Sequence, residues 1–412
     1  MNKRMILYIQ GAILLIESAI MVLPIATALI YRETSGVWFF YTALAAAICG
    51  FAAMKLSRPR TKTIYAKEGL ITVALGWIVL SLVGALPFTL SGEIPFYLDA
   101  VFEMISGFTT TGSSILPNVE ALSRCMLLWR SFSHWLGGMG ILVFMLAIVK
   151  MEGGQGIHLL RAESPGPTVG KMVPRMVDSS KILYTIYFAL TLVQVVFYLA
   201  GGMPLFDSLC NAFATAGTGG FSIKADSFAS YSPYLQTVTT VFMALFGVNF
   251  SIYFFLLQKK FDLAFKNTEL RWYVGIILFS IAMITANILP MYPDFHAAIH
   301  HAAFSVSSVI TTTGFGTENF DLWPEFSRVV FLMIVGASAG STGGGLKVSR
   351  LVILVRAAQV EVRRLIRPRT VKVMRIDGKP VGQDTVRAVS GYLILYVLIC
   401  MVSSPASTAR RR

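Results

Sequence analysis

The chain has 412 residues, of which 55% are hydrophobic and only 14% charged, and its formal net charge is +14. Apolar runs of about 20 residues recur along it, which is the length that spans the hydrocarbon core of a bilayer. This composition excludes an ordinary soluble domain and predicts an all-α polytopic membrane protein. Lys and Arg gather in the cytoplasmic loops of such proteins, so we expect no nucleic-acid partner.

Two apolar segments, residues 5–30 and 37–56, open the chain and are followed by a basic loop. The first is too long for the apolar region of a cleaved signal peptide and lacks a small-residue cleavage site. Glu17, inside it, is a carboxylate that is costly in a membrane. We expect it to pair with a neighbouring helix, and a direct place in an ion path is the alternative.

A Thr/Gly-rich loop then occurs three times, at residues 106–113, 214–222 and 308–316. Each copy follows a long apolar run and a short amphipathic stretch, and a second apolar run follows it. This order predicts a repeated unit of helix, short re-entrant helix, loop and helix.

The pattern predicts the following elements in chain order. The long helices span 69–90, 122–149, 181–201, 234–257 and 272–290. The re-entrant helices span 97–108, 205–216 and 295–309. The loops span 109–113, 216–221 and 310–315, and an interrupted helix runs from about 325 to 366.

We divide the chain into five parts on this basis. They are 1–67, two leading helices and a basic loop; 68–150, repeat one; 151–260, repeat two with its preceding loop; 261–366, repeat three; and 367–412, a basic segment with the first helix of a partial repeat four.

Thr/Gly loops at membrane depth suit a cation path. Irregular backbone survives in a bilayer only where it lines a cavity or is buried in protein. Glycine permits backbone angles that turn carbonyl oxygens toward an axis, threonine adds a hydroxyl, and rings of such oxygens replace the hydration shell of K⁺. The alternative is that these are turns that merely link helices, but three copies in register favour a filter.

A glycine-rich stretch, residues 336–347, interrupts what would otherwise be a continuous membrane helix. Glycine costs about 1 kcal/mol per helical position relative to alanine, so we expect a loop at membrane depth. A nucleotide-phosphate loop is excluded because Leu346 separates Gly345 from Lys347 where Gly-Lys-Ser/Thr is required. We therefore predict a mobile gate in which Lys347 repels cations; its residues are Gly336, Gly340, Gly343, Gly344, Gly345 and Lys347.

Charge predicts the orientation. Most Lys and Arg lie in residues 1–4, 55–67, 150–181, 259–271 and 347–387. The positive-inside rule therefore places the amino terminus in the cytoplasm and the Thr/Gly loops on the outer side. Acidic residues outnumber basic ones in the outward segments, counting Glu103 and Arg130 among them, so the entrance should favour cations.

A last apolar run, about 386–403, looks like the first helix of a fourth repeat. A fourth loop at the usual spacing would fall beyond residue 412, and the final residues show no amphipathic re-entrant pattern. We expect the ring of carbonyl oxygens to lack one side, as a result of a natural truncation, a frameshift or a fragment.

These motifs resemble the Trk/Ktr/HKT superfamily of potassium transporters, most of all the bacterial Trk-type membrane subunit. The resemblance covers residues 1–403. Its most specific elements are TTTG at 109–112, WLGGMG at 135–140, TGGF at 218–221, TTTGF at 311–315 and AGSTGGGLKV at 339–348.

The resemblance implies four pseudo-symmetric repeats around one pore, with filter glycines Gly112, Gly220 and Gly314 and a preference for K⁺ over Na⁺. We assign the filter to Thr110, Thr111, Gly112, Thr218, Gly219, Gly220, Thr312, Thr313 and Gly314. K⁺ would bind at Thr111, Gly112, Gly219, Gly220, Thr313 and Gly314. The resemblance further implies a homodimer in the bacterial inner membrane and a cytosolic nucleotide-binding regulatory ring, for which the basic segment 350–387 is a docking surface.

We therefore predict K⁺ uptake, passive or by symport, with potassium as substrate, no cofactor and no enzymatic activity. The alternative is a non-conducting product that at most associates with regulator or partner subunits. A membrane enzyme is the third possibility, because His296 and His300 share a helix face beside His301. Packing or mouth polarity is the favoured role for these histidines, and for His134 a packed polar group. The four cysteines, Cys49, Cys125, Cys210 and Cys400, show no CxxC spacing, which favours neither a disulfide framework nor a metal site.

Overall fold

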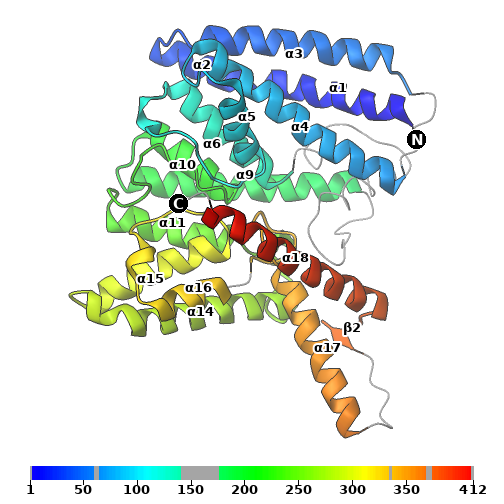
Figure 1. The fold of residues 1–412 in the computed structure, drawn as a ribbon, viewed down its shortest axis with the longest axis vertical. Helices are drawn as coiled ribbons and strands as arrows, with labels where there is room; N and C mark the ends of the chain where they lie inside the picture. The colour runs from blue at the N-terminus through cyan, green and yellow to red at the C-terminus, as the bar shows by residue number, and fades with distance from the viewer. Residues whose placement is uncertain (1, 60–64, 141–175, 334–335, 368–373, 410–412) are drawn as a thin grey trace.

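The computed structural model describes residues 2–59, 65–140, 176–333, 336–367 and 374–409. Helices dominate, and the strands in the described part are β1 (Arg375–Ile376) and β2 (Lys379–Pro380), which pair antiparallel. The all-α fold class is confirmed. Figure 1 shows most long helices side by side across the view, with α17 leaving the bundle.

The leading helices are α1 (Lys3–Ile20), α2 (Val22–Tyr31) and α3 (Gly36–Leu56). Met21 lies between α1 and α2, yet both belong to one candidate membrane span, so the predicted segment 5–30 is two helices in one crossing. The carboxylate of Glu17 is buried and accepts no hydrogen bond from any described group, so the expected pairing is wrong within the described residues.

The next helices are α4 (Ala66–Ser91), the short α5 (Tyr97–Phe108), η1 (Val119–Ala121) and α6 (Arg124–Gly138). The predicted bounds of α5 are those observed. The predicted helix 122–149 is described only to Gly138 and its following turn, and residues 141–149 lie outside the described residues.

The middle of the chain forms α9 (Met176–Ala200), α10 (Leu205–Ala216), α11 (Pro233–Phe246) and α12 (Phe250–Leu257). The prediction of one helix over 234–257 is wrong, because α11 and α12 meet at 91°. Asn249, which we expected inside that helix, instead caps α12, and its side chain accepts a hydrogen bond from the Ser251 backbone N–H at 2.9 Å.

The last part contains α13 (Phe261–Phe265), α14 (Thr268–Ile288), η2 (Leu289–Met291), α15 (Phe295–Ile310), η3 (Phe320–Leu322), α16 (Glu325–Met333), α17 (Val348–Ile366) and α18 (Gln383–Ala409). The predicted interruption therefore separates α16 from α17. Within the described residues, five helices are long and apolar enough to cross a membrane, or six if α11 and α12 form one broken span.

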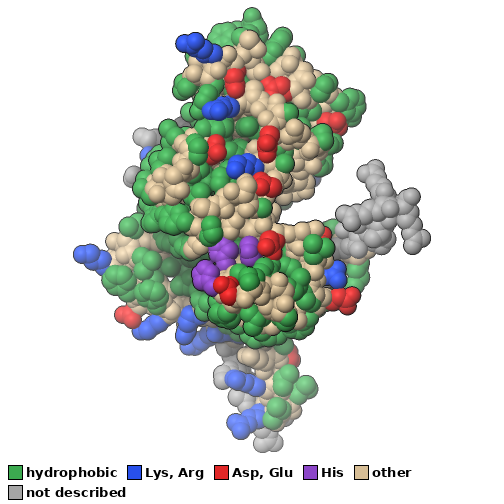
Figure 2. Space-filling view, turned by 90° about the vertical axis from the view of Figure 1, so that its left-hand side faces the viewer, with side chains coloured by type: hydrophobic (Ala, Val, Ile, Leu, Met, Phe, Trp, Pro, Cys, Tyr) green, Lys and Arg blue, Asp and Glu red, His purple; other side chains and the backbone are tan. Residues whose placement is uncertain are grey.

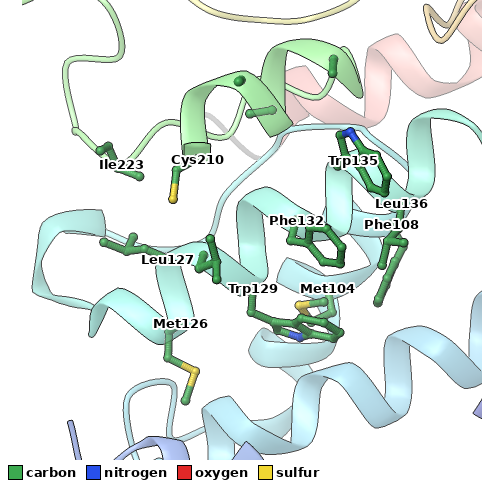
Figure 3. Packing of buried hydrophobic residues seen from close by; sticks show 14 of the residues in the cluster. Met104, Phe108, Met126, Leu127, Trp129, Phe132, Trp135, Leu136, Cys210 and Ile223 are labelled. Carbon is green, nitrogen blue, oxygen red and sulfur yellow. The ribbon is translucent and has the colours of Figure 1, made fainter. Parts of the chain in front are cut away.

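The main core surrounds the first short helix. Figure 3 shows aromatic side chains of α6, among them Trp129, Phe132 and Trp135, packed close to Met104 and Phe108 of α5. Trp129 also donates its indole N–H to the Gly84 carbonyl of α4 at 3.1 Å. Buried aromatic side chains thus fix α5, the helix that carries the first Thr/Gly loop.

Close helix approach at a glycine pair supplies a test of the leading helices. A Cβ added to Gly50 of α3 would lie 2.8 Å from the Gly11 carbonyl oxygen of α1. We expect Gly50→Leu to destabilise the protein by about 1–3 kcal/mol, because the two helices must separate. The measurement is thermal unfolding in detergent. Gly391→Leu in α18, where an added Cβ meets no atom within 4 Å, is the control; an equal loss in both variants would contradict the packing argument.

Candidate functional site

The three Thr/Gly loops share one backbone conformation. In each, a threonine has positive φ, the next residue does not, and the glycine after it does again. The φ angles are 53° and 76° at Thr110 and Gly112, 52° and 80° at Thr218 and Gly220, and 58° and 86° at Thr312 and Gly314. The three copies therefore agree in geometry as well as in sequence.

Each short helix ends in a Schellman closure that sets up this conformation. In the first copy, Thr110 N–H donates to Gly107 O at 3.1 Å and Thr111 N–H donates to Ser106 O at 2.9 Å. The second copy repeats both bonds from Thr218 and Gly219, each at 3.0 Å, and the third repeats them from Thr312 and Thr313 at 3.0 and 2.8 Å. The helix ends thus leave the following carbonyls free of helical bonding.

The left-handed threonines are unusual. A β-branched residue rarely adopts positive φ, and within the described residues these three are the only β-branched residues that do. Such a conformation costs on the order of 1–3 kcal/mol and persists only where the surroundings enforce it, most often at functional sites. Three equivalent examples mark these loops as the candidate site.

Consecutive loops touch through their glycines. A Cβ added to Gly112 would lie 1.9 Å from the Gly219 carbonyl oxygen, and one added to Gly220 would lie 1.9 Å from the Thr313 carbonyl oxygen. Only glycine permits this approach. Gly314 has no described atom within 4 Å of an added Cβ. The loops therefore lie one against the next in chain order.

His134 of α6 joins the first two copies. It is fully buried; its Nε2 accepts the Phe221 backbone N–H at 3.2 Å, so its Nδ1 carries the proton and donates to the Gly107 carbonyl at 2.7 Å. Added Cβ atoms on Gly217 and Gly219 would meet the His134 carbonyl at 2.1 Å and its ring at 2.3 Å. The histidine is packed, as predicted, and it also sets the spacing between two loops.

A buried ion pair lies behind the same loops. Arg130 of α6 bonds Glu103 of α5, with Nη2 to Oε1 at 2.6 Å, and both side chains are almost fully buried. The carboxylate also accepts the Ile115 backbone N–H at 3.1 Å, and the guanidinium lies 4.1 Å from the Phe221 ring centroid. The inclusion of both residues among the outer entrance charges is therefore wrong, because burial and pairing remove them from the surface.

The glycine-rich loop between α16 and α17 lies against the second and third copies. Thr218 Oγ1 donates to the Thr342 carbonyl at 3.0 Å, and Gly344 N–H donates to Thr312 Oγ1 at 2.7 Å. An added Cβ on Gly343 would lie 3.1 Å from the Thr311 carbonyl oxygen. Two of the three left-handed threonines thus hold this loop.

The break between α11 and α12 holds the other side of the glycine-rich loop. Ser338 N–H donates to Gly247 O and Phe250 N–H donates to Gly340 O, each at 3.0 Å. The bend that sequence reasoning missed therefore provides backbone partners for a second irregular segment.

Glu269, near the start of α14, ties both ends of the glycine-rich loop. Its Oε1 accepts the Ala339 N–H at 2.6 Å and the Ser349 N–H at 3.1 Å. Sequence reasoning missed this residue, although a carboxylate at the start of an apolar span is itself a signal. Lys347, predicted to face cations, is buried with its ammonium on the Gly343 carbonyl.

Histidines and carboxylates gather beside the third copy. The rings of His296 and His300 stack with centroids 6.5 Å apart, and those of His300 and His301 lie 5.3 Å apart. Figure 2 shows histidine side chains gathered on one face with acidic side chains next to them. His301 Nε2 lies 3.4 Å from Glu318 Oε1, and His300 contacts Gln236 at 2.7 Å. Burial, with the adjacent Glu318 carboxylate, raises the pKa of Tyr292, whose hydroxyl donates to Glu318. Within the described residues, no group of three or more His, Cys, Asp or Glu has metal-binding geometry.

The buried pair behind the loops yields a stability prediction. Glu103→Ala leaves the Arg130 guanidinium buried without its carboxylate, and we expect a loss of about 3–5 kcal/mol in the free energy of unfolding. Glu325→Ala removes an exposed partner of Arg328 at 3.8 Å and should cost no more than about 1 kcal/mol. Unfolding in detergent measures both, and similar losses would refute the role of the buried pair.

Comparisons with known proteins identify the family. The family model of the TrkH cation transport proteins matches residues 38–406. The chain is 34% identical to the Trk system potassium uptake protein TrkH of Salmonella typhimurium, over 99% of this chain and 86% of the relative. It is 35% identical to TrkH of Escherichia coli K12 with the same coverage.

The fold agrees with a solved structure. The crystal structure of the potassium transporter TrkH from Vibrio parahaemolyticus matches with a TM-score of 0.86 and 32% identity, over 98% of this chain and 85% of that chain. The match confirms a multi-pass membrane fold and a family of transporters, not enzymes. The chain belongs to the TrkH family of cation transport proteins.

Proposed function

We propose that this protein takes up potassium through a filter made by the three Thr/Gly loops. The relatives are potassium uptake proteins by name. The observation that carries the proposal is the repeated left-handed Thr and Gly in three loops that touch in chain order. The alternation of left-handed and ordinary φ directs carbonyl oxygens away from intrahelical hydrogen bonds. Such oxygens can replace the hydration shell of K⁺.

The filter would consist of three short steps. Oxygens of Thr110, Thr218 and Thr312 form the inner step; those of Thr111, Gly219 and Thr313 the middle one; and those of Gly112, Gly220 and Gly314 the outer one. Their close backbone approach favours this assignment, because ligand oxygens must converge on one axis. The parts 68–150, 151–260 and 261–366 would each contribute one wall, with 1–67 and 367–412 outside them.

The glycine-rich loop would act as the gate. It lies against two filter threonines, and its glycines Gly336, Gly340, Gly343, Gly344 and Gly345 allow it to fold back on itself. The positive charge of Lys347 beside Gly343 would oppose cation passage while the loop is seated. Withdrawal of the loop would open the path.

Orientation and assembly follow from charge. We place the amino terminus in the cytoplasm and the chain in the bacterial inner membrane, because most Lys and Arg lie in residues 1–4, 55–67, 150–181, 259–271 and 347–387, which the positive-inside rule assigns to the cytoplasm. The exposed arginines of segment 350–387, such as Arg363 and Arg364, would dock a cytosolic nucleotide-binding ring, and two copies would form a homodimer. Uptake would be passive or coupled to a second ion, as in symport.

The filter predicts a steric hierarchy among glycine variants. Gly220→Ala should abolish selective K⁺ uptake, because its Cβ would meet the Thr313 carbonyl at 1.9 Å. Gly314→Ser should weaken K⁺/Na⁺ discrimination less, since only its positive φ opposes a side chain, at about 1 kcal/mol. The measurement is ⁸⁶Rb⁺ and Na⁺ uptake in a bacterium that lacks its own potassium transporters.

Gly316→Ala is the matched control. Gly316 lies in the third loop with Gly314 but has an ordinary φ, and an added Cβ would lie 3.6 Å from its nearest neighbour. Normal selectivity in an active Gly220→Ala protein would refute the filter. An absence of uptake in the well-expressed wild-type chain would instead favour a non-conducting, partner-binding role.

The gate predicts a gain of flux. Removal of residues 336–345 should raise K⁺ influx because the proposed gate is then absent. Glu269→Ala should raise it because the loop loses two charge-assisted hydrogen bonds of about 1.5–3 kcal/mol each. Glu361→Ala, an exposed carboxylate on α17, is the control. Unchanged or lower influx in a folded Glu269→Ala protein would show that this loop does not close the path.

A further inference from the structure

A cavity of about 510 Å³ opens between α14 and α17. Thr268, Arg271 and Arg356 line its polar end, and Trp272, Gly275, Ile276 and Phe279 line the rest. The polar residues from α14 lie at the first turn of a candidate membrane span, whereas the apolar ones lie farther along it. Arg356 donates to the Arg375 carbonyl, and Asp377, two residues on, accepts the Thr268 N–H, so Arg356 lies at the same end as Arg271.

The two arginines of the cavity form no ion pair with any acid in the described part of the chain. The hydrogen bond from Arg356 to the Arg375 carbonyl holds its guanidinium in place. Two carboxylates near the first turn of α14 form their hydrogen bonds with other groups. Glu269 accepts the Ala339 and Ser349 N–H groups, and Asp377 accepts those of Thr268 and Asn267.

The apolar end is open and shaped by a glycine. An added Cβ on Gly275 meets no described atom within 4 Å, so the helix leaves a furrow there. Phe279 is 66% exposed and Trp272 is 38% exposed, and both belong to a membrane span, so their exposed surfaces can contact lipid. Tryptophan is typical of the membrane–water boundary, which places the arginines at head-group level.

We propose that this cavity binds a phospholipid with an anionic head group, such as phosphatidylglycerol. The phosphate would lie between Arg271 and Arg356, since guanidinium groups match phosphate oxygens, and one acyl chain would follow Gly275, Ile276 and Phe279. Basic pockets between membrane helices recognise anionic lipids in this manner. A soluble phosphate compound would leave the apolar furrow unfilled.

The site also adjoins the glycine-rich loop. Thr268 lines the cavity, and the next residue, Glu269, accepts the Ala339 N–H inside that loop and the Ser349 N–H just after it. A lipid that bridges α14 and α17 would brace the two helices that hold the loop. This consequence rests on the proposed gate, whereas lipid binding itself does not.

Native mass spectrometry of the full chain, released from nanodiscs of mixed phosphatidylglycerol and phosphatidylcholine, tests the site. We expect the wild type to retain phosphatidylglycerol and R271Q/R356Q to bind it roughly tenfold to thirtyfold more weakly. R363Q/R364Q removes two exposed arginines from α17 that do not line the cavity, and it should bind like the wild type. Gly275→Leu fills the furrow without a change of charge and should also weaken retention.

Several results would overturn the proposal. Equal losses of phosphatidylglycerol in R271Q/R356Q and R363Q/R364Q would show that overall positive charge, and not this cavity, retains the lipid. Full retention by Gly275→Leu would show that no acyl chain lies in the furrow. Displacement of the lipid by inorganic phosphate would assign a phosphate site instead. Because every readout is binding, these results are independent of whether the chain transports potassium.

Discussion

Backbone polar groups inside a membrane need partners, and this constraint explains the centre of the molecule. The three short helices end in Schellman closures, which force a threonine of each loop into left-handed backbone. That strain is held by buried groups behind the loops. His134 bonds two loops, and the Arg130–Glu103 pair secures the first short helix and the chain that leaves its loop.

The same constraint explains the glycine-rich loop. Its backbone finds partners in the α11–α12 break, in Thr218 and Thr312, and in the single carboxylate of Glu269. Residues 336–347 carry few large apolar side chains, so hydrogen bonds, which can exchange, set much of the position of this segment. A brace between α14 and α17 would act on this balance, because Glu269 belongs to the first of these helices and Ser349 to the second.

Much of the fold follows from sequence pattern. Amphipathic stretches before the Thr/Gly loops predicted α5 and α10 with the bounds observed and α15 to within one residue, and apolar length predicted the membrane spans. The glycine content of residues 336–347 predicted the interruption between α16 and α17. These features depend on local periodicity, propensity and the thickness of a bilayer, which a sequence carries without reference to distant residues.

Sequence by itself thus determined the family, the helical class and the three repeated loops. Tertiary structure alone decided which partners satisfy them. Sequence pattern could not predict left-handed threonines, because glycine is the usual residue at that position. It also missed the 91° bend after α11, the bonds of Glu269 and the burial of Arg130 and Lys347. These last features depend on groups far apart in the chain, which only packing brings into contact.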